Sequence, residues 1–166
     1  MVATAAMSPS TFFSALPVAL AGRLPAELRA FEHKRGFGRL MKFDYGDPGV
    51  HYEAWHHTAT GRMEVGLHLE GPAAANEAGF RLLRGRLVEI RHLLPHAELE
   101  PWDKGWYRLY ETFRAPVLSP EVLEGTAARL AAYITALHPI LESEGGVPPR
   151  VGRAQPFPPP APLGGR

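Results

Sequence analysis

The sequence predicts a single two-layer α+β domain, in which helices cover one face of an antiparallel five-stranded sheet. Stretches that alternate apolar and polar residues predict the strands, and turn signals separate them. Other stretches repeat their apolar residues every three or four positions, as buried helices do. The 166 residues, of which 45% are hydrophobic, suffice for one sizeable core. We expect the order helix, three strands, helix, two strands, helix.

The N-terminal segment, residues 1–23, is expected to form an arm or a helix that packs on the domain. Its apolar run, residues 11–22, has no charged residue before Arg23, whereas a secretory signal needs a basic start. Pro17 interrupts this run, which is too short to span a bilayer. We therefore expect neither a signal peptide nor a membrane span here.

The domain itself is expected over residues 24–144. Pro25 favours the start of a helix and Gly36 favours its end, so they predict a helix over residues 25–36. Apolar side chains alternate in residues 37–45, which predicts the first strand. The Gly-Asp-Pro-Gly turn that follows leads into a hairpin formed by the second and third strands.

A second hairpin and two more helices complete the expected domain. Apolar residues recur at spacings of three and four over residues 72–94, which predicts one long helix. The hairpin turns at residues 103–105, where a three-residue loop with glycine last suits a type I turn plus a bulge. Ser119 caps the last helix, which is expected to end near His138 because Pro139 interrupts it.

Residues 145–166 are rich in proline and glycine and offer little with which to build a core. We expect a flexible tail with a bias toward polyproline II conformation. Its QPFPPPAP stretch has the PxxP spacing that aromatic grooves recognise, although an inert tail is the simpler interpretation.

The hairpin over residues 50–70 concentrates metal-capable side chains. Its core-facing set follows from strict alternation and consists of Val50, Tyr52, Ala54, Met63, Val65, Leu67 and Leu69. The opposite face then carries His51, Glu53, Trp55, His57, Glu64, His68 and Glu70. A four-residue loop ending in Gly61 keeps these sets together and needs a positive φ only at glycine. A two-residue loop also keeps them, whereas a three-residue loop would break the face apart.

The four-residue loop places His51 opposite His68, with Glu53 and Glu70 as near neighbours. Directly opposed residues have Cβ atoms about 4.5–5.5 Å apart, so two imidazoles and a carboxylate can reach one ion. This predicts a candidate site for a divalent metal such as Zn²⁺, with Glu70 as a further ligand or a base. The alternative is a solvated face with cross-strand His–Glu pairs, since the sequence completes no established metal, phosphate or dinucleotide motif.

Large aromatic side chains are expected on the same face. The second hairpin sets Trp102 opposite Trp106 and Glu100 opposite Arg108. A candidate contact surface for a protein partner is therefore formed by Trp55, Trp102, Trp106 and Arg108. Trp and Arg are the residue types that dominate binding hot spots. The alternative is that some of these rings pack under the N-terminal helix or the tail. Open sheets also stack aromatic rings on RNA bases.

Net charge and cysteine content exclude several classes of binding partner and of functional site. The formal net charge of +1, from 18 basic and 17 acidic residues, gives no attraction toward nucleic acid or anionic membranes. The chain has no cysteine, which excludes disulfides, thiolate metal sites and cysteine nucleophiles. This composition fits a reducing compartment, so we expect a cytoplasmic protein.

The expected element order is similar to that of the type III secretion chaperone-like fold. The resemblance covers roughly residues 24–144 and is carried by element order, without a motif that could be matched residue by residue. It implies a curved antiparallel sheet with helices on one face, dimerisation, and binding of extended segments of a partner protein.

The sequence therefore favours a non-catalytic protein-binding or chaperone-like module, expected to be a homodimer without a cofactor. The competing hypothesis is a metal-dependent protein that uses the His/Glu face of the hairpin. An exposed aromatic sheet would favour the first, and a cleft closed over the polar groups would favour the second.

Overall fold

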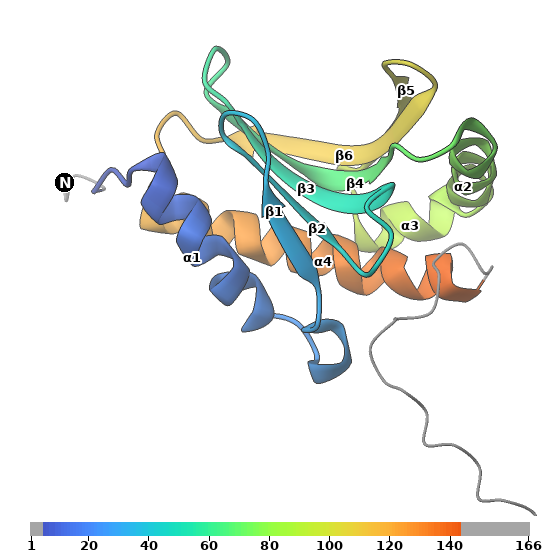
Figure 1. Ribbon diagram of the computed structural model, residues 1–166, viewed down its shortest axis with the longest axis horizontal. Helices are drawn as coiled ribbons and strands as arrows, with labels where there is room; N and C mark the ends of the chain where they lie inside the picture. The colour runs from blue at the N-terminus through green and yellow to red at the C-terminus, as the bar shows by residue number, and fades with distance from the viewer. Residues whose placement is uncertain (1–4, 144–166) are drawn as a thin grey trace, which may run out of the picture.

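The computed structural model describes residues 5–143, which form a six-stranded antiparallel sheet and four α-helices (Figure 1). The helices are α1 (Pro9–Ala21), α2 (Ala73–Gly85), α3 (Leu87–Leu93) and α4 (Pro120–Ser143), with a 3₁₀ turn η1 (Ala26–Leu28). The strands are β1 (Glu32–Arg35), β2 (Leu40–Asp44), β3 (Val50–His57), β4 (Arg62–Leu69), β5 (Glu98–Trp102) and β6 (Trp106–Arg114). Their order in the sheet is β1-β2-β3-β4-β6-β5. The α+β class and the antiparallel sheet are confirmed, with six strands instead of five.

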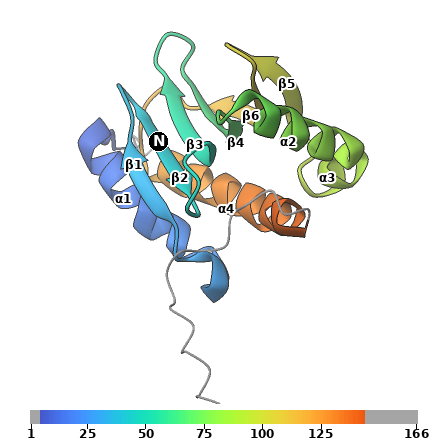
Figure 2. The same cartoon turned by 45° about the vertical axis from the view of Figure 1, so that its right-hand side comes forward.

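The helices of residues 5–143 all lie on one side of the sheet, which we call the inner face (Figures 1 and 2). Helices α1 and α4 run beside each other below β1–β4, and α2 and α3 lie near the β4–β6 end. The core fills the space between, with its largest buried side chains including Phe12, Phe13, Leu16, Tyr52, Leu67, Leu109 and Tyr133. The opposite surface, which no helix of these residues covers, is called the outer face.

The sixth strand comes from a segment for which the sequence predicts a helix. Only η1 is helical there, and the chain then extends as β1 along β2. Phe31 packs its ring against Phe43 at 5.4 Å between centroids, and the Tyr45 hydroxyl donates to the Leu28 carbonyl at 2.6 Å. The helix predicted over residues 25–36 is therefore wrong, because a short helix is marginal by itself and these tertiary contacts favour the extended chain.

Two helix boundaries also differ from the sequence prediction. The long helix over residues 72–94 is divided into α2 and α3 at Arg86, whose φ of −113° and ψ of 14° are not helical. Helix α4 continues through Pro139, although its end was expected there. Proline removes one hydrogen bond in a helix, but Ile140 and Leu141 beyond it are buried in the core, which offsets that loss.

Both hairpins have the predicted register. The β3–β4 loop has four residues with Gly61 at φ 63°, so His51 lies opposite His68. In the β5–β6 hairpin Trp102 lies opposite Trp106. The expected type I turn at residues 103–105 is wrong, because φ is positive at all three positions.

The first and last helices of the domain form where the sequence predicts a helix. Ser119 caps α4 as predicted, since its hydroxyl accepts from the Val122 N–H at 3.2 Å. The N-terminal segment forms a helix, and α1 buries Phe12, Leu16 and Leu20 against the core. No helix within residues 5–143 is long and apolar enough to cross a membrane. The predicted proline-rich tail, residues 145–166, lies outside the described residues.

Candidate metal centre

The polar side chains predicted on the outer face of β3 and β4 are there, but most of them are buried. His51, Glu53 and His68 are only 1%, 3% and 0% exposed, and Glu64 is equally buried. The alternative of a solvated polar face is therefore wrong. Burial of an ionisable group destabilises the fold unless the group is fully paired, so the partners of these side chains determine the stability of the outer face.

Neighbouring side chains from β5 and β6 provide much of the cover. The Trp102 ring meets the His68 ring edge-on, with centroids 5.6 Å apart. The Arg108 guanidinium lies over the Tyr110 ring at 3.9 Å and over the Trp102 ring at 5.2 Å. Trp55 approaches Trp102 from the β3 side at 6.5 Å. In Figure 1 β5 rises above the outer face at one end of the sheet.

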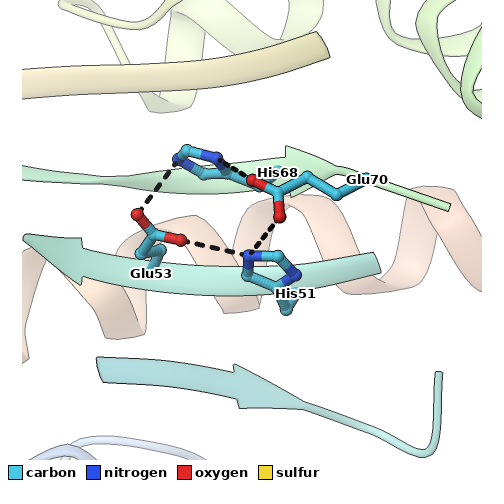
Figure 3. A group of neighbouring side chains, drawn as sticks. All are labelled: His51, Glu53, His68 and Glu70. Atoms are coloured by element: carbon cyan, nitrogen blue, oxygen red, sulfur yellow. Dashed lines mark hydrogen bonds and ion pairs between the residues drawn. The ribbon is translucent and has the colours of Figure 1, made fainter. Parts of the chain in front are cut away.

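Four of the buried groups form a closed ring of alternating bases and acids (Figure 3). The imidazoles of His51 and His68 are nearly parallel, with centroids 5.5 Å apart. Glu53 lies 3.1 Å from His51 Nε2 and 3.9 Å from His68 Nε2. Glu70 closes the ring, 3.1 Å from His68 Nδ1 and 3.8 Å from His51 Nε2. Each residue thus offers a ligand atom, and these atoms lie within 4.8 Å of one another.

The backbone fixes the orientation of His51. Its Nδ1 lies 2.9 Å from the carbonyl oxygen of Pro48, in the turn before β3. Because a carbonyl oxygen only accepts, Nδ1 must carry the proton and donate it. In the neutral ring the Nε2 lone pair then points at two carboxylates. That arrangement is repulsive unless Nε2 is also protonated or binds a cation.

His68 is held from both sides. Its Nδ1 faces Glu70, and its Nε2 lies 3.2 Å from Glu64 Oε1. Burial alone lowers the pKa of His68, but the hydrogen bonds with Glu64 and Glu70 and the charge of Glu53 outweigh burial and raise the pKa to about 9. Without a metal, His68 is therefore an imidazolium that donates to two carboxylates.

Glu64 is itself fixed by three partners. Arg108 Nη1 lies 3.1 Å from Glu64 Oε2, and His57 Nε2 lies 3.0 Å from the same oxygen. Burial raises the pKa of Glu64, but the hydrogen bond with His68 and the charge of Arg108 outweigh burial and lower the pKa overall. Arg108 also binds Glu100 at 2.6 Å. Its guanidinium is thus occupied within the protein, although the sequence offered it as a partner contact.

Glu70 stands at the border of the cluster. Lys42 Nζ, on β2, reaches across β3 and lies 3.2 Å from Glu70 Oε2. Burial raises the pKa of Glu70, but the hydrogen bond with His68 and the charges of His51 and Lys42 lower it to about 2. Glu70 therefore remains a carboxylate over the whole physiological pH range.

The charges of this network do not balance when its imidazoles are neutral. Four carboxylates, those of Glu53, Glu64, Glu70 and Glu100, then face one ammonium and one guanidinium. Two negative charges remain. Two protonated imidazoles neutralise them, and so does one divalent cation.

The spacing of the ring fits a small transition-metal ion. Zn²⁺ binds His nitrogen and carboxylate oxygen at about 2.0–2.2 Å, so ligand atoms in a tetrahedral site lie about 3.3 Å apart. The ring has separations of 3.1 and 3.8 Å around His51 Nε2. His51 presents Nε2 with Nδ1 fixed by a carbonyl, and His68 can present Nδ1 with Nε2 fixed by Glu64. Such outer partners are the usual supports of metal-binding histidines.

The structure thus brings together the four ligands predicted from the sequence: His51, Glu53, His68 and Glu70. Sequence reasoning missed the supporting roles of Pro48, Lys42, Glu64 and Arg108. Alternation had already put Glu64 on the right face. The role of Arg108 depends on the pairing of β4 with β6, which no local pattern reveals.

The tryptophans named as partner contacts also share the outer face. Trp102 and Trp106 lie 6.1 Å apart, and Lys104 sits over the Trp106 ring at 5.6 Å. Trp55, Trp102 and Trp106 are half-buried, whereas Lys104 is exposed. They therefore form an aromatic rim beside the ring of bases and acids.

Compared with protein-family models, with curated proteins and with solved structures, the chain matches none of them. The function must therefore be argued from the geometry and chemistry of the site.

Proposed function

We propose that this protein binds one divalent transition-metal ion, with Zn²⁺ the best fit, through His51, Glu53, His68 and Glu70. The observation that carries the proposal is the buried ring of two imidazoles and two carboxylates, whose ligand atoms lie within 4.8 Å of one another. Two nitrogen and two oxygen ligands, without a thiolate, suit Zn²⁺ and similar ions better than Ca²⁺ or Mg²⁺, which prefer oxygen alone.

The proposed role of the ion is non-catalytic. Structural zinc sites are closed by four protein ligands, whereas catalytic sites keep one position for water or substrate. Here four protein groups surround the position, and their side chains are almost fully buried. An ion in this place would join β3 to β4 and neutralise the two surplus negative charges.

Metal analysis of the purified, tag-free protein tests this proposal. We expect close to one equivalent of zinc after dialysis against a zinc buffer, and titration calorimetry should give a stoichiometry near one. His51→Ala and Glu53→Gln should each abolish stoichiometric binding, the second without changing the shape of the side chain. His92→Ala is the matched control, because His92 is exposed on α3.

Two results would overturn the metal proposal. One is a wild-type protein that retains no ion and whose melting temperature is unchanged by zinc or chelator. The other is zinc binding that survives in folded His51→Ala and Glu53→Gln variants, because the ion would then be held elsewhere.

A second candidate function is that of a protein-binding module, which the aromatic rim supports. Trp55, Trp102 and Trp106 lie half-buried on the face that no helix of residues 5–143 covers. Tryptophan at an open surface is a frequent anchor in protein interfaces. Trp106→Ala tests this candidate: it should change the oligomeric state in light scattering or the set of proteins captured in a pull-down. If both are unchanged, the binding-module proposal fails.

A further inference from the structure

A second feature of the outer face is a groove between the β1–β2 hairpin and Trp55. It has a volume of about 570 Å³ and is lined by Lys34, Arg35, Phe37, Leu40, Lys42 and Trp55. Small-molecule sites have volumes of about 300–1,000 Å³, so the groove has the size of a ligand site. It does not share a ligand with the proposed metal centre, although Lys42 borders both.

Positive charge is concentrated in this groove. Lys34 and Lys42 are directly opposite each other on β1 and β2. Arg35 follows Lys34 on β1, but its guanidinium lies on the inner face, 4.4 Å from the centre of the Phe13 ring. Like charges in directly opposed positions destabilise a sheet. Lys42 reaches Glu70, but Lys34 makes no ion pair within residues 5–143, and no carboxylate is among the described residues that line the groove. A bound anion would pair with the Lys34 ammonium.

The walls of the groove are apolar and partly aromatic. Trp55 on β3 is half-buried and forms one wall of the groove, beside Leu40 on the paired strand β2. Phe37, at the tip of the β1–β2 hairpin, is completely exposed, at 102% of its reference area. A flat ring can stack on such side chains, and stacking on aromatic rings is favourable for every nucleobase.

We propose that this groove binds a small organic anion that carries a flat aromatic ring, as a mononucleotide does. The anionic group would lie between Lys34 and Lys42, and the ring would lie against Trp55. A small ligand fits better than a nucleic acid, because the volume is that of a ligand site and the chain has a net charge of only +1.

Calorimetric titration of the full chain with three probes separates the two parts of the groove. The probes are adenosine 5′-monophosphate, adenosine and inorganic phosphate. The monophosphate should bind about tenfold or more tightly than either fragment, because only it uses both the lysines and the aromatic wall. Binding should be similar in chelator and in zinc buffer, so that a failure of the metal proposal leaves this test intact.

Charge reversal at Lys34 is the decisive variant. Lys34→Glu should weaken binding of adenosine 5′-monophosphate about tenfold or more, because it replaces an attraction by a repulsion. Lys104→Glu is the matched control, since this exposed lysine lies in the β5–β6 turn away from the groove and should leave binding unchanged. Phe37→Ala, at a fully exposed position, tests the aromatic wall without threatening the fold and should weaken the monophosphate more than phosphate.

Several outcomes would overturn the groove proposal. These are no binding of the monophosphate at millimolar concentration, affinity no better than that of phosphate, and equal effects of Lys34→Glu and Lys104→Glu. Much tighter, strongly salt-dependent binding of a single-stranded oligonucleotide would indicate a nucleic-acid surface instead. Binding that requires zinc would place the ligand on the metal.

Discussion

Both faces of the β3–β4 hairpin are largely buried, but for different physical reasons. On the inner face Tyr52, Val65 and Leu67 pack against the helices, where burial of apolar surface stabilises them whatever the pH. On the outer face His51 and His68 are buried by other side chains of the sheet and by charged partners. The apolar side chains of the inner face need only to match in shape and volume, whereas the buried charges of the outer face need to be paired.

Because of this difference, protons and metal ions are expected to act on the hairpin through its outer face. An apolar layer is indifferent to protons and metal ions. A buried network with surplus negative charge is stable only while protons or a cation complete it. Four experiments, in order of decreasing expected effect, test this contrast.

The largest effect is expected on the inner face. Leu67→Ala should lower the free energy of unfolding by about 4 kcal/mol, within the range for fully buried leucines that leave a cavity. The loss should be the same at pH 5.5 and 8.5 and with or without zinc. Urea titrations at both pH values check this. A loss that changes with pH or zinc would mean that the two faces are not independent.

The second-largest loss in the free energy of unfolding is expected when a charge is removed from the outer face. Arg108→Met should cost about 3 kcal/mol, because it removes the guanidinium that pairs with the buried carboxylate of Glu64. Arg81→Met is the control: its pair with Glu77 is exposed and should contribute about 0.5 kcal/mol or less. Denaturant unfolding of both variants gives the comparison. Equal costs would show that charge pairing does not stabilise the outer face.

The third effect is the pH dependence of the free energy of unfolding in the metal-free protein, which should come from the outer face. The pKa of His68 is raised from 6.5 to about 9, so its stabilisation is complete below pH 6.5 and is lost as the pH rises through 9. The pKa of Glu70 is lowered to about 2, so its stabilisation is present above pH 4.5 and is lost as the pH falls through 2. Between pH 5.5 and 8.5 the free energy of unfolding should fall by roughly 2 kcal/mol.

Urea unfolding in chelator measures this pH dependence, and nitrogen-edited NMR of the His68 ring reports its titration directly. Leu67→Ala should shift the whole curve without altering its slope. A His68 ring that loses its proton near pH 6.5 would contradict the prediction.

The smallest expected effect is that of the metal itself at modest excess. Zinc at ten times its dissociation constant should stabilise the protein by about 1.4 kcal/mol, as mass action requires for one site. The Leu67→Ala variant should keep this increment, and Glu53→Gln should lose it. Thermal melts at several zinc concentrations provide the measurement. Because the ion displaces a proton from His68, zinc should bind more tightly at pH 8.5 than at pH 5.5.

The sequence predicted the face of the hairpin well because alternation is a local property. The positive φ at Gly61 allows the four-residue loop, and the loop sets His51 against His68. From these facts alone the four metal-capable residues follow. The burial of these residues could not be predicted in this way, because alternation separates the two faces of a strand without indicating what covers the second face.

Non-local contacts explain the other differences. The segment of β1 has the residues of a short helix, but Phe31 finds the Phe43 ring when the chain is extended. Arg86 interrupts the long helix between Leu83 and Ile90, which are both buried against the core. Neither preference is visible in a window of neighbouring residues, because each depends on a surface that another part of the chain supplies.

The edges of the sheet have a consequence for behaviour at high concentration. All four residues of β1 are exposed, and they are Glu32, His33, Lys34 and Arg35. The other edge, β5, contains Pro101, which has no N–H to offer to an added strand. Charged and proline-bearing edges resist the pairing of sheets between molecules that leads to aggregates and fibrils. Contacts between copies of this protein are therefore expected to form through its faces, and the sheet itself ends with each molecule.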